Sequence, residues 1–224
     1  MMICLSGLVG FLLMLTAEAR VGNSSELHFC SETDQCLLFD LICKTEEYEV
    51  RHYGSVKAVS AEHSSYFMEI ATFKLFRKLF DYISGDNEYG VKIEMTAPVI
   101  IKISEGKSSF PIFNMKKYTY TMSFLLPTEH QENPPTPNDG KVFIGDMPAM
   151  TMYVRSFKGL MTSFFYTKVA DSLSSDLDSE GAKYEKDHHY AVGYNSPKKM
   201  FDSYNEVWYV VQGDPVCSSS EEMG

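Results

Sequence analysis

The feature that most constrains the fold is a repeated order of elements. The alternating stretch Tyr48–Gly54 is typical of a β-strand, and a helix-like segment and further strand-like segments follow it. A related stretch, Tyr153–Gly159, is followed by the same order. Two similar halves indicate an internal duplication, so one fold must accommodate two copies of a strand–helix–strand unit. The main chemical difference between the two stretches is His52 in the first against Ser156 in the second.

Hydrophobic periodicity predicts one helix in each half. Ser64–Ile83 carries apolar residues at helical spacing, and Ser64 or Ser65 is a suitable N-cap. The predicted apolar stripe of this helix is Tyr66, Ile70, Phe73, Phe76, Leu79, Phe80 and Ile83. In the second half we expect a helix over Thr162–Leu177 that ends at Gly181. Its apolar residues, four positions apart, are Phe165, Val169, Leu173 and Leu177.

Strand-like segments outnumber the two helices. The predicted strands are Tyr48–Ala61, Val91–Ile103, Tyr118–Leu126, Val142–Ile144, Thr151–Phe157, His189–Tyr194 and Glu206–Gln212. A proline-rich surface loop, Pro127–Gly140, is expected to join the two halves, and Pro98 should lie at a bend or an edge. This order predicts an α+β fold, in which an antiparallel sheet curls into a barrel with the helices outside.

The start of the chain indicates export. Ile3–Leu15 is a short apolar run followed by Ala17-Glu18-Ala19, which predicts a secretory signal peptide at residues 1–19. The run is shorter than the roughly 20 apolar residues that a membrane span needs, although no Lys or Arg precedes it. The remaining boundaries are predicted as a cysteine-bearing segment at 20–46, one domain at 47–213 and a polar tail at 214–224.

The cysteines agree with an oxidising compartment. Cys30, Cys36, Cys43 and Cys217 remain after cleavage, an even number that suits disulfide bonds. Four cysteines allow three pairings, and all three stay open; zinc is a weaker alternative, because the spacing matches no metal knuckle. Asn23-Ser24-Ser25 is an acceptor sequence for N-glycosylation, so we expect a secreted glycoprotein. The net charge of −10 disfavours nucleic acid and anionic membranes as main partners.

Five phrases, in a fixed order, resemble the SOUL family of heme-binding proteins. They are Tyr48–Gly54, Lys92–Val99, Pro134–Pro137, Gly193–Pro197 and Asn205–Trp208, and the resemblance extends from about Tyr48 to Gln212. It implies a pseudo-two-fold, distorted antiparallel β-barrel flanked by two helices. It also implies reversible, non-covalent binding of b-type heme or another porphyrin in an apolar groove. The signal peptide and the cysteine-bearing segment would make this chain a secreted variant.

The resemblance implies a role for one histidine. In one branch of the family the histidine of the Arg-His-Tyr phrase is a proposed axial ligand of the heme iron, and His52 has that position. A neutral imidazole is a good iron ligand; the alternative is a histidine at a strand end that is hydrogen-bonded to a neighbour. This chain has Ala58 where that branch has Trp, and Ser203 where it has Arg. It therefore lacks an aromatic wall near His52 and a cation for a propionate.

Other side chains are candidates for binding the tetrapyrrole. Arg51 and Lys92 could pair with its propionates, the alternative being solvated charges on a strand face. Met95 and Met68 are candidate second ligands, although methionine more often fills a core or lines an apolar pocket. Phe76 belongs to the predicted helical stripe, one edge of which could face the ligand.

Two further observations bear on the chemistry. His188-His189 resembles a metal-binding pair, but adjacent strand residues point to opposite faces, so we expect an exposed turn near Asp187 instead. The sequence has no nucleophile elbow, phosphate-binding loop or zinc-protease motif, so no enzyme is expected. The predicted function is a secreted carrier or scavenger of heme or another porphyrin. The alternatives are an interaction module of the same fold that binds a protein partner, and a small enzyme acting on tetrapyrroles.

Overall fold

The computed structural model describes residues 21–110, 115–196, 199 and 202–217. The predicted signal peptide and the end of the polar tail lie outside the described residues. The helices are α1 Met68–Ile83 and α2 Ser163–Ser179, with short 3-10 helices η1 Ser24–Glu26 and η2 Thr128–His130. The strands are β1 Val21–Asn23, β2 Gln35–Leu37, β3 Asp40–Lys44, β4 Glu49–Tyr53, β5 Val56–Ser65, β6 Val99–Phe110, β7 Met115–Leu125, β8 Val142–Met147, β9 Met150–Lys158, β10 His188–Gly193 and β11 Tyr204–Val210. Neither described α-helix has the length and apolar character to cross a membrane.

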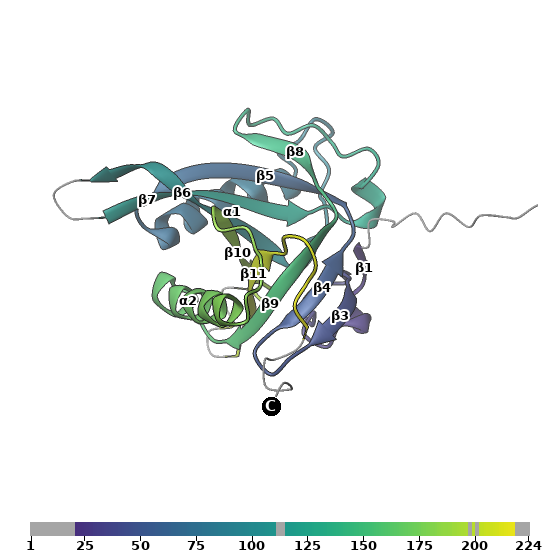
Figure 1. The fold of residues 1–224 in the computed structure, drawn as a ribbon. Coiled ribbons are helices and arrows are strands. Elements are labelled where there is room, and N and C mark those ends of the chain that lie inside the picture. The colour runs from purple at the N-terminus through teal and green to yellow at the C-terminus, as the bar shows by residue number, and fades with distance from the viewer. Residues whose placement is uncertain (1–20, 111–114, 197–198, 200–201, 218–224) are drawn as a thin grey trace, which may run out of the picture.

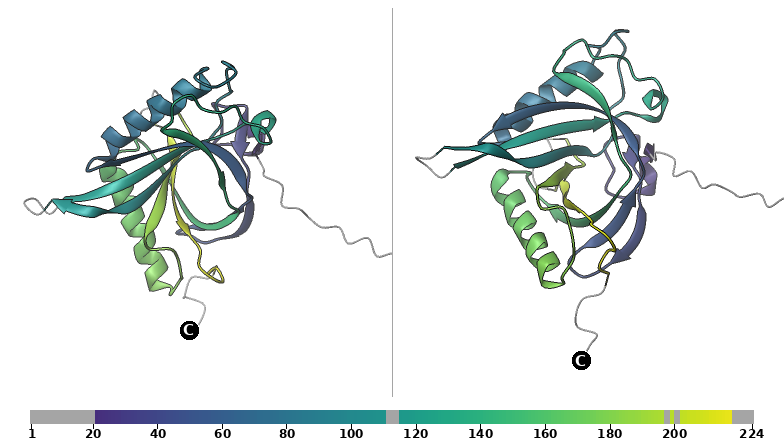
Figure 2. Two further views of the ribbon diagram at one scale, coloured as in Figure 1. Left: turned by 90° about the horizontal axis from the view of Figure 1, so that it is seen from above. Right: turned by 45° about the horizontal axis from the view of Figure 1, so that its top comes forward.

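Nine of the described strands form one antiparallel sheet in the order β3-β4-β9-β11-β10-β6-β7-β5-β8. The sheet curls into a half-barrel, and α1 and α2 lie outside it (Figures 1 and 2). The order of strands β4 to β8 is symmetric about the β10–β6 pair, so that β9-α2-β10-β11 corresponds to β5-α1-β6-β7 and β4 to β8. The predicted α+β fold, with a curled antiparallel sheet and two outer helices, is confirmed.

The two sequence stretches that suggested the duplication do not correspond to each other. β9, which contains Tyr153, is equivalent to β5, whereas β4 lies beside β9 in the sheet. Val50 pairs with Tyr153 and His52 pairs with Thr151. The stretches look alike because both are strands with one residue in two directed at a core. Comparing His52 with Ser156 as equivalent positions was therefore wrong.

The first helix begins later than predicted and buries a different face. Ser64 and Ser65 complete β5, and Phe67 is the N-cap, without a side-chain hydrogen bond to the helix. The buried residues of α1 are Met68, Ala71, Leu75, Leu79, Tyr82 and Ile83, whereas Ile70, Phe73 and Phe80 are exposed. Both sets recur at intervals of three and four, so periodicity alone could not choose between them. The predicted stripe was wrong except at Leu79 and Ile83, while Phe76 is half-buried.

Two strand boundaries also differ from prediction, and so does the buried face of α2. The first strand is broken at Gly54-Ser55 into β4 and β5, and β6 starts only at Val99, after a cis Ala97–Pro98 peptide. Pro98 is the residue immediately before β6. α2 is capped by Thr162, whose Oγ1 accepts from the Phe165 N–H at 3.4 Å. Phe165 itself is exposed, and the helix buries Tyr166, Ala170, Leu173 and Leu177.

The sheet has a core on each face. The outer face packs against both helices, for example through Leu75 and Leu173. The inner face surrounds Trp208 and also takes side chains from the cysteine-bearing segment, such as Phe29 and Leu37. Cys30 pairs with Cys36, and Cys43 pairs with Cys217. These disulfides choose one of the three possible pairings and leave none of these cysteines for zinc.

Candidate functional site

The structure does not bring the predicted tetrapyrrole-binding residues together at one place. Arg51 and His52 lie on β4, Phe76 and Met95 line a groove beside α1, Met68 lines a separate cavity between the helices, and Lys92 is exposed in the segment before β6. The two positions where the chain departs from the family phrases are not sheet neighbours of His52, whose partners are Asp40 and Thr151. Ala58 is buried in the inner core, and Ser203 is buried immediately before β11.

His52 is half-buried on the outer face of the sheet. Its Nδ1 lies 3.2 Å from Thr151 Oγ1 on β9, and its strand neighbour on the other side is Asp40 of β3. His52 lines neither of the two cavities described below. This geometry matches the alternative of a histidine that is hydrogen-bonded to a neighbour, and iron ligation by His52 stays a prediction.

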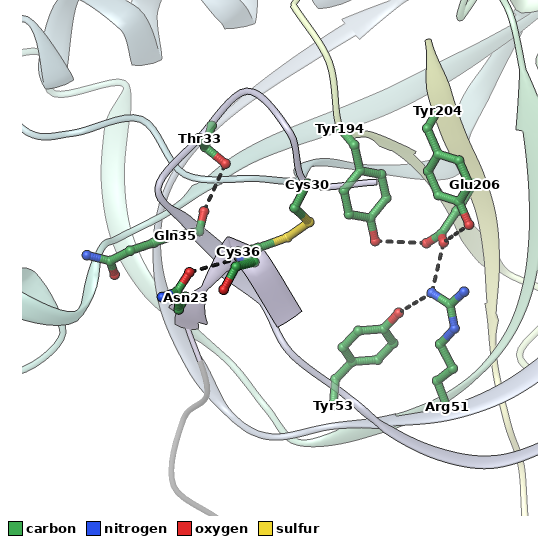
Figure 3. The surroundings of a disulfide bond; sticks show 11 residues. Asn23, Cys30, Thr33, Gln35, Cys36, Arg51, Tyr53, Tyr194, Tyr204 and Glu206 are labelled. Carbon is green, nitrogen blue, oxygen red and sulfur yellow. Dashed lines mark hydrogen bonds and ion pairs between the residues drawn. A yellow bond between two sulfur atoms is a disulfide. The ribbon is translucent and has the colours of Figure 1, made fainter. Parts of the chain in front are cut away.

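Arg51 belongs to a buried ion-pair network inside the half-barrel (Figure 3). Its Nη1 donates to Glu206 Oε1 at 2.8 Å, and its Nη2 lies 2.6 Å from Glu49 Oε2. The side chains of Arg51 and Glu206 are 3% and 0% exposed. The guanidinium also lies 4.1 Å from the centre of the Phe39 ring, a cation–π contact. Arg51 is thus held by protein groups and does not present its charge to a ligand.

Glu206 is the centre of this network. It accepts hydrogen bonds from Tyr194 Oη at 2.9 Å, Tyr204 Oη at 3.1 Å and Trp208 Nε1 at 2.7 Å, in addition to Arg51. Burial and the nearby Glu206 charge raise the pKa of Tyr204 to about 12 and raise the pKa of Tyr194, so both hydroxyls keep their protons and donate. Three of the five family phrases therefore meet in one structural cluster, a role that sequence reasoning did not assign to them.

Phe76 and Met95 line an apolar groove between α1 and the residues that follow β10. Its volume is about 220 Å³, and Phe80, Val99 and Tyr194 also border it. The rings of Phe76 and Phe80 are stacked, with centroids 5.9 Å apart, and Phe76 meets Phe124 of the sheet edge-on. Of the residues predicted to bind a tetrapyrrole, the groove therefore brings together Phe76 and Met95, but not His52.

The disulfide loop Cys30–Cys36 closes one side of this groove. Glu32 Oε2 accepts from the Ser196 N–H at 2.6 Å, and Glu32 Oε1 accepts from Asn195 Nδ2 at 3.1 Å. Lys199 Nζ lies 4.0 Å from the same carboxylate. The loop therefore brings a negative charge to the rim of the groove.

A larger cavity, of about 400 Å³, lies between α1, α2 and the sheet. It is lined by Met68 and by His189, which sequence reasoning placed in an exposed turn. That expectation was wrong, because His188 and His189 begin β10 and His189 packs between Tyr166 and Tyr209. Burial lowers the pKa of His189 to about 4, so its imidazole is neutral at pH 7. The predicted strand already carried the signal, because alternation puts His189 on the same face as the core residue Ala191.

Comparisons with known proteins agree with this architecture. Residues 34–210 match the family model described as SOUL heme-binding protein. Heme-binding protein 2 from Homo sapiens is 38% identical over 168 residues, covering 75% of this chain and 80% of that protein. Heme-binding protein 1 from Xenopus tropicalis is 30% identical over 164 residues, covering 73% and 83%.

Solved structures with the same architecture have very different sequences. The crystal structure of the EcmrR C-terminal domain matches with a TM-score of 0.54 at 10% identity, covering 80% of this chain and all of that domain. At this identity the likeness shows the fold alone. The family model, by contrast, spans most of the sheet and both helices. The chain belongs to the SOUL heme-binding protein family.

Proposed function

We propose that the protein binds heme or another tetrapyrrole reversibly and non-covalently, and that it acts outside the cell as a carrier or scavenger. Family membership and the names of its relatives, heme-binding proteins 1 and 2, support the ligand class. The observation that carries the placement is the apolar groove beside α1, where the predicted residues Phe76 and Met95 lie together. A binding role rather than a catalytic one agrees with the family description.

The groove residues fit a tetrapyrrole that is only partly enclosed. A volume of about 220 Å³ is below the roughly 300–1,000 Å³ of sites that enclose a small molecule, so part of the macrocycle would stay in solvent. The stacked rings of Phe76 and Phe80 and the thioether of Met95 offer the apolar face against which it would lie. Bound heme would supply an iron that a thioether or imidazole can ligate. Partial enclosure suits reversible binding.

Charged side chains around the groove determine how well it accepts the propionates of a tetrapyrrole. Lys199, at the rim, is close to Glu32, and Lys92 is exposed in the segment that leads to Met95. These two lysines are the cations that we assign to the propionates, in place of Arg51, which is buried with Glu206. Glu32 opposes them, because its carboxylate would repel a propionate at the same rim.

A hemin titration followed by the Soret band tests this proposal. We expect a saturable shift at one equivalent, and binding at least about tenfold weaker in Phe80→Glu, because the change removes apolar contact and adds a charge at the groove. Phe80 is 49% exposed, so the variant should fold. Phe164→Glu is the matched control, since Phe164 is 73% exposed on α2 and does not line the groove.

Each alternative has its own outcome in that experiment. No saturable shift, with the protein folded by circular dichroism, would contradict tetrapyrrole binding and favour an interaction module of the same fold. Equal hemin affinities of Phe80→Glu and Phe164→Glu would indicate that the ligand binds outside the groove. A His52→Ala arm tests iron ligation separately, because loss of the ligand changes the Soret position. Open-chain tetrapyrrole products after incubation with hemin would favour the enzyme.

The extracellular part of the proposal rests on other residues. The two disulfides and the exposed acceptor Asn23 support it, as does the apolar run at the start of the sequence. Expression of the full chain in secretory cells should release a protein that begins at Arg20 and loses mass with peptide-N-glycosidase. An Asn23→Gln variant should lose that mass change. Retention of the whole chain inside the cells would contradict secretion.

A further inference from the structure

The cavity between the two helices is lined by several tyrosine rings and has no part in the proposed tetrapyrrole site. Its edge is closed where the two helices start, because Glu69 Oε1 accepts from the Ser163 N–H at 2.9 Å and from Ser163 Oγ at 2.7 Å. Its volume of about 400 Å³ lies in the range of sites that enclose a small molecule. The tyrosines that line it are Tyr66, Tyr118, Tyr120, Tyr166, Tyr184 and Tyr209.

Two side chains of this cavity, Tyr166 and His189, have polar atoms without a hydrogen-bond partner among the described residues. Tyr166 is 3% exposed, and its hydroxyl has no hydrogen-bond partner within the described part of the chain. An unpaired buried hydroxyl costs roughly 1–3 kcal/mol, so a ligand that bonds to it recovers this energy. Beside it the neutral imidazole of His189 is stacked on the Tyr166 ring, with centroids 5.6 Å apart. Neither ring nitrogen of His189 has a hydrogen bond to the residues that the structure describes.

The charged groups around the cavity are mainly negative. Glu105, Asp171 and Asp187 line it, but Glu105 is paired with Lys116 and Asp187 is hydrogen-bonded to His188. Asp171, exposed on α2 beside Tyr166, has no ion pair within the described part of the chain. Lys186 is the cation among its lining residues, but its Nζ is 2.8 Å from Asp178. The faces of tyrosine rings attract cations, and carboxylates at the rim add to that attraction. The same carboxylates repel an anion such as a tetrapyrrole with two propionates.

We propose that this cavity binds a small planar aromatic cation, such as a protonated aromatic amine or amidine. The ligand ring lies against the tyrosine rings, its N–H group donates to the Tyr166 hydroxyl oxygen or to the free His189 nitrogen, and its charge faces Asp171. The site is independent of the tetrapyrrole groove, because the lining residues of the two differ throughout.

Isothermal titration calorimetry with three probes of similar size tests the charge preference. The probes are 9-aminoacridine, which is cationic at pH 7, neutral acridine and the anionic anilinonaphthalenesulfonate. We expect 9-aminoacridine to bind at one equivalent and acridine to bind at least about fivefold more weakly. The anion should not bind. Saturating hemin should leave the 9-aminoacridine affinity unchanged. Equal binding of cation and anion, no binding of the cation, or its displacement by hemin would overturn the proposal.

Three variants locate the bound cation. Tyr166→Phe keeps the ring and should weaken binding about fivefold, while Tm stays equal or rises, because the variant loses only an unpaired hydroxyl. Asp171→Asn should weaken binding about threefold to tenfold, whereas the matched control Asp81→Asn, at an exposed position on α1 that does not line the cavity, should have no effect. Thr167→Trp, at an exposed lining position, should block the cavity in a protein that still folds. Unchanged affinity in both Tyr166→Phe and Thr167→Trp would place the cation elsewhere and overturn the proposal.

Discussion

Replacing Glu206 by Gln should strongly destabilise the protein, because this carboxylate neutralises a buried guanidinium. Gln keeps the shape of the side chain but loses its charge, and its amide nitrogen cannot accept a hydrogen bond. Glu206 accepts four hydrogen bonds, from Arg51, Tyr194, Tyr204 and Trp208. In the variant some of these donors are left without an acceptor.

The expected loss follows from the burial of the pair. Both side chains are almost fully excluded from solvent, and among the described residues Arg51 keeps Glu49, whose side chain is 22% exposed, as its counter-charge. Removing one partner of a buried ion pair typically costs about 3–5 kcal/mol. For a chain of this size that corresponds to a fall in Tm of about 6–20 °C.

Urea denaturation with the disulfides intact measures this loss. Trp208 is the single tryptophan of the chain, and it donates to Glu206, so its fluorescence reports on the site itself. Far-UV circular dichroism should give the same midpoint if unfolding is two-state. Asp146→Asn is the control, because Asp146 pairs with Lys57 at an exposed position, and it should cost less than about 1 kcal/mol.

A second substitution separates charge burial from packing. In Arg51→Met/Glu206→Gln no guanidinium is left unneutralised, so the double variant should be less destabilised than the sum of the two single variants. Strict additivity, or a loss below about 1 kcal/mol for Glu206→Gln alone, would refute the view that the family phrases meet in an energetically important ion pair.

Three other changes have defined outcomes. Replacing Cys43 and Cys217 by Ser should lower the free energy of unfolding by up to about 5 kcal/mol, because the disulfide closes a loop with a sequence separation of 174 residues; urea denaturation measures it. The pKa of His189 falls from 6.5 to about 4 on folding, so the unfolded state binds more protons between these values and stability falls as pH drops from 6.5 to 4. His189→Phe should flatten this dependence, and an identical slope in urea midpoints from pH 7 to 4.5 would contradict it. Glu32→Gln should raise hemin affinity about threefold to tenfold, because it weakens the loop that closes the groove and removes a charge that repels propionates; a hemin titration with unchanged affinity would oppose this.

Local patterns predicted both helices and the strands from β4 to β11, but neither strands β1 to β3 of the cysteine-bearing segment nor the buried face of α1. The helix over residues 64–83 was expected, yet its exposed face carries Phe73 and Phe80 while Ala71 and Leu75 are buried. Residue type favoured burial of the phenylalanines, and only the packing of α1 on β5 and β7 determines which face is buried. The choice matters for function, because the half-exposed aromatic face of α1 is what borders the groove.

Sequence patterns also could not identify contacts between residues far apart in the chain. The alternation in Tyr48–Gly54 correctly separated Arg51 from His52, but no local signal showed that Arg51 would meet Glu206, 155 residues away. The cation was therefore interpreted as a propionate partner. The family phrases did not distinguish residues that hold the fold from residues that face a ligand, because both kinds include polar and aromatic side chains.

The position of the iron tests the central claim most directly. Two amide spectra of the isotopically labelled protein are compared. One is recorded with one equivalent of hemin, which is paramagnetic, and the other with one equivalent of its diamagnetic zinc analogue. We predict that the resonances broadened only by hemin centre on Phe76, Met95 and Gly193–Ser196. Broadening centred on His52 and Thr151 would contradict placement of the tetrapyrrole in the groove, and the absence of specific broadening would contradict tetrapyrrole binding itself.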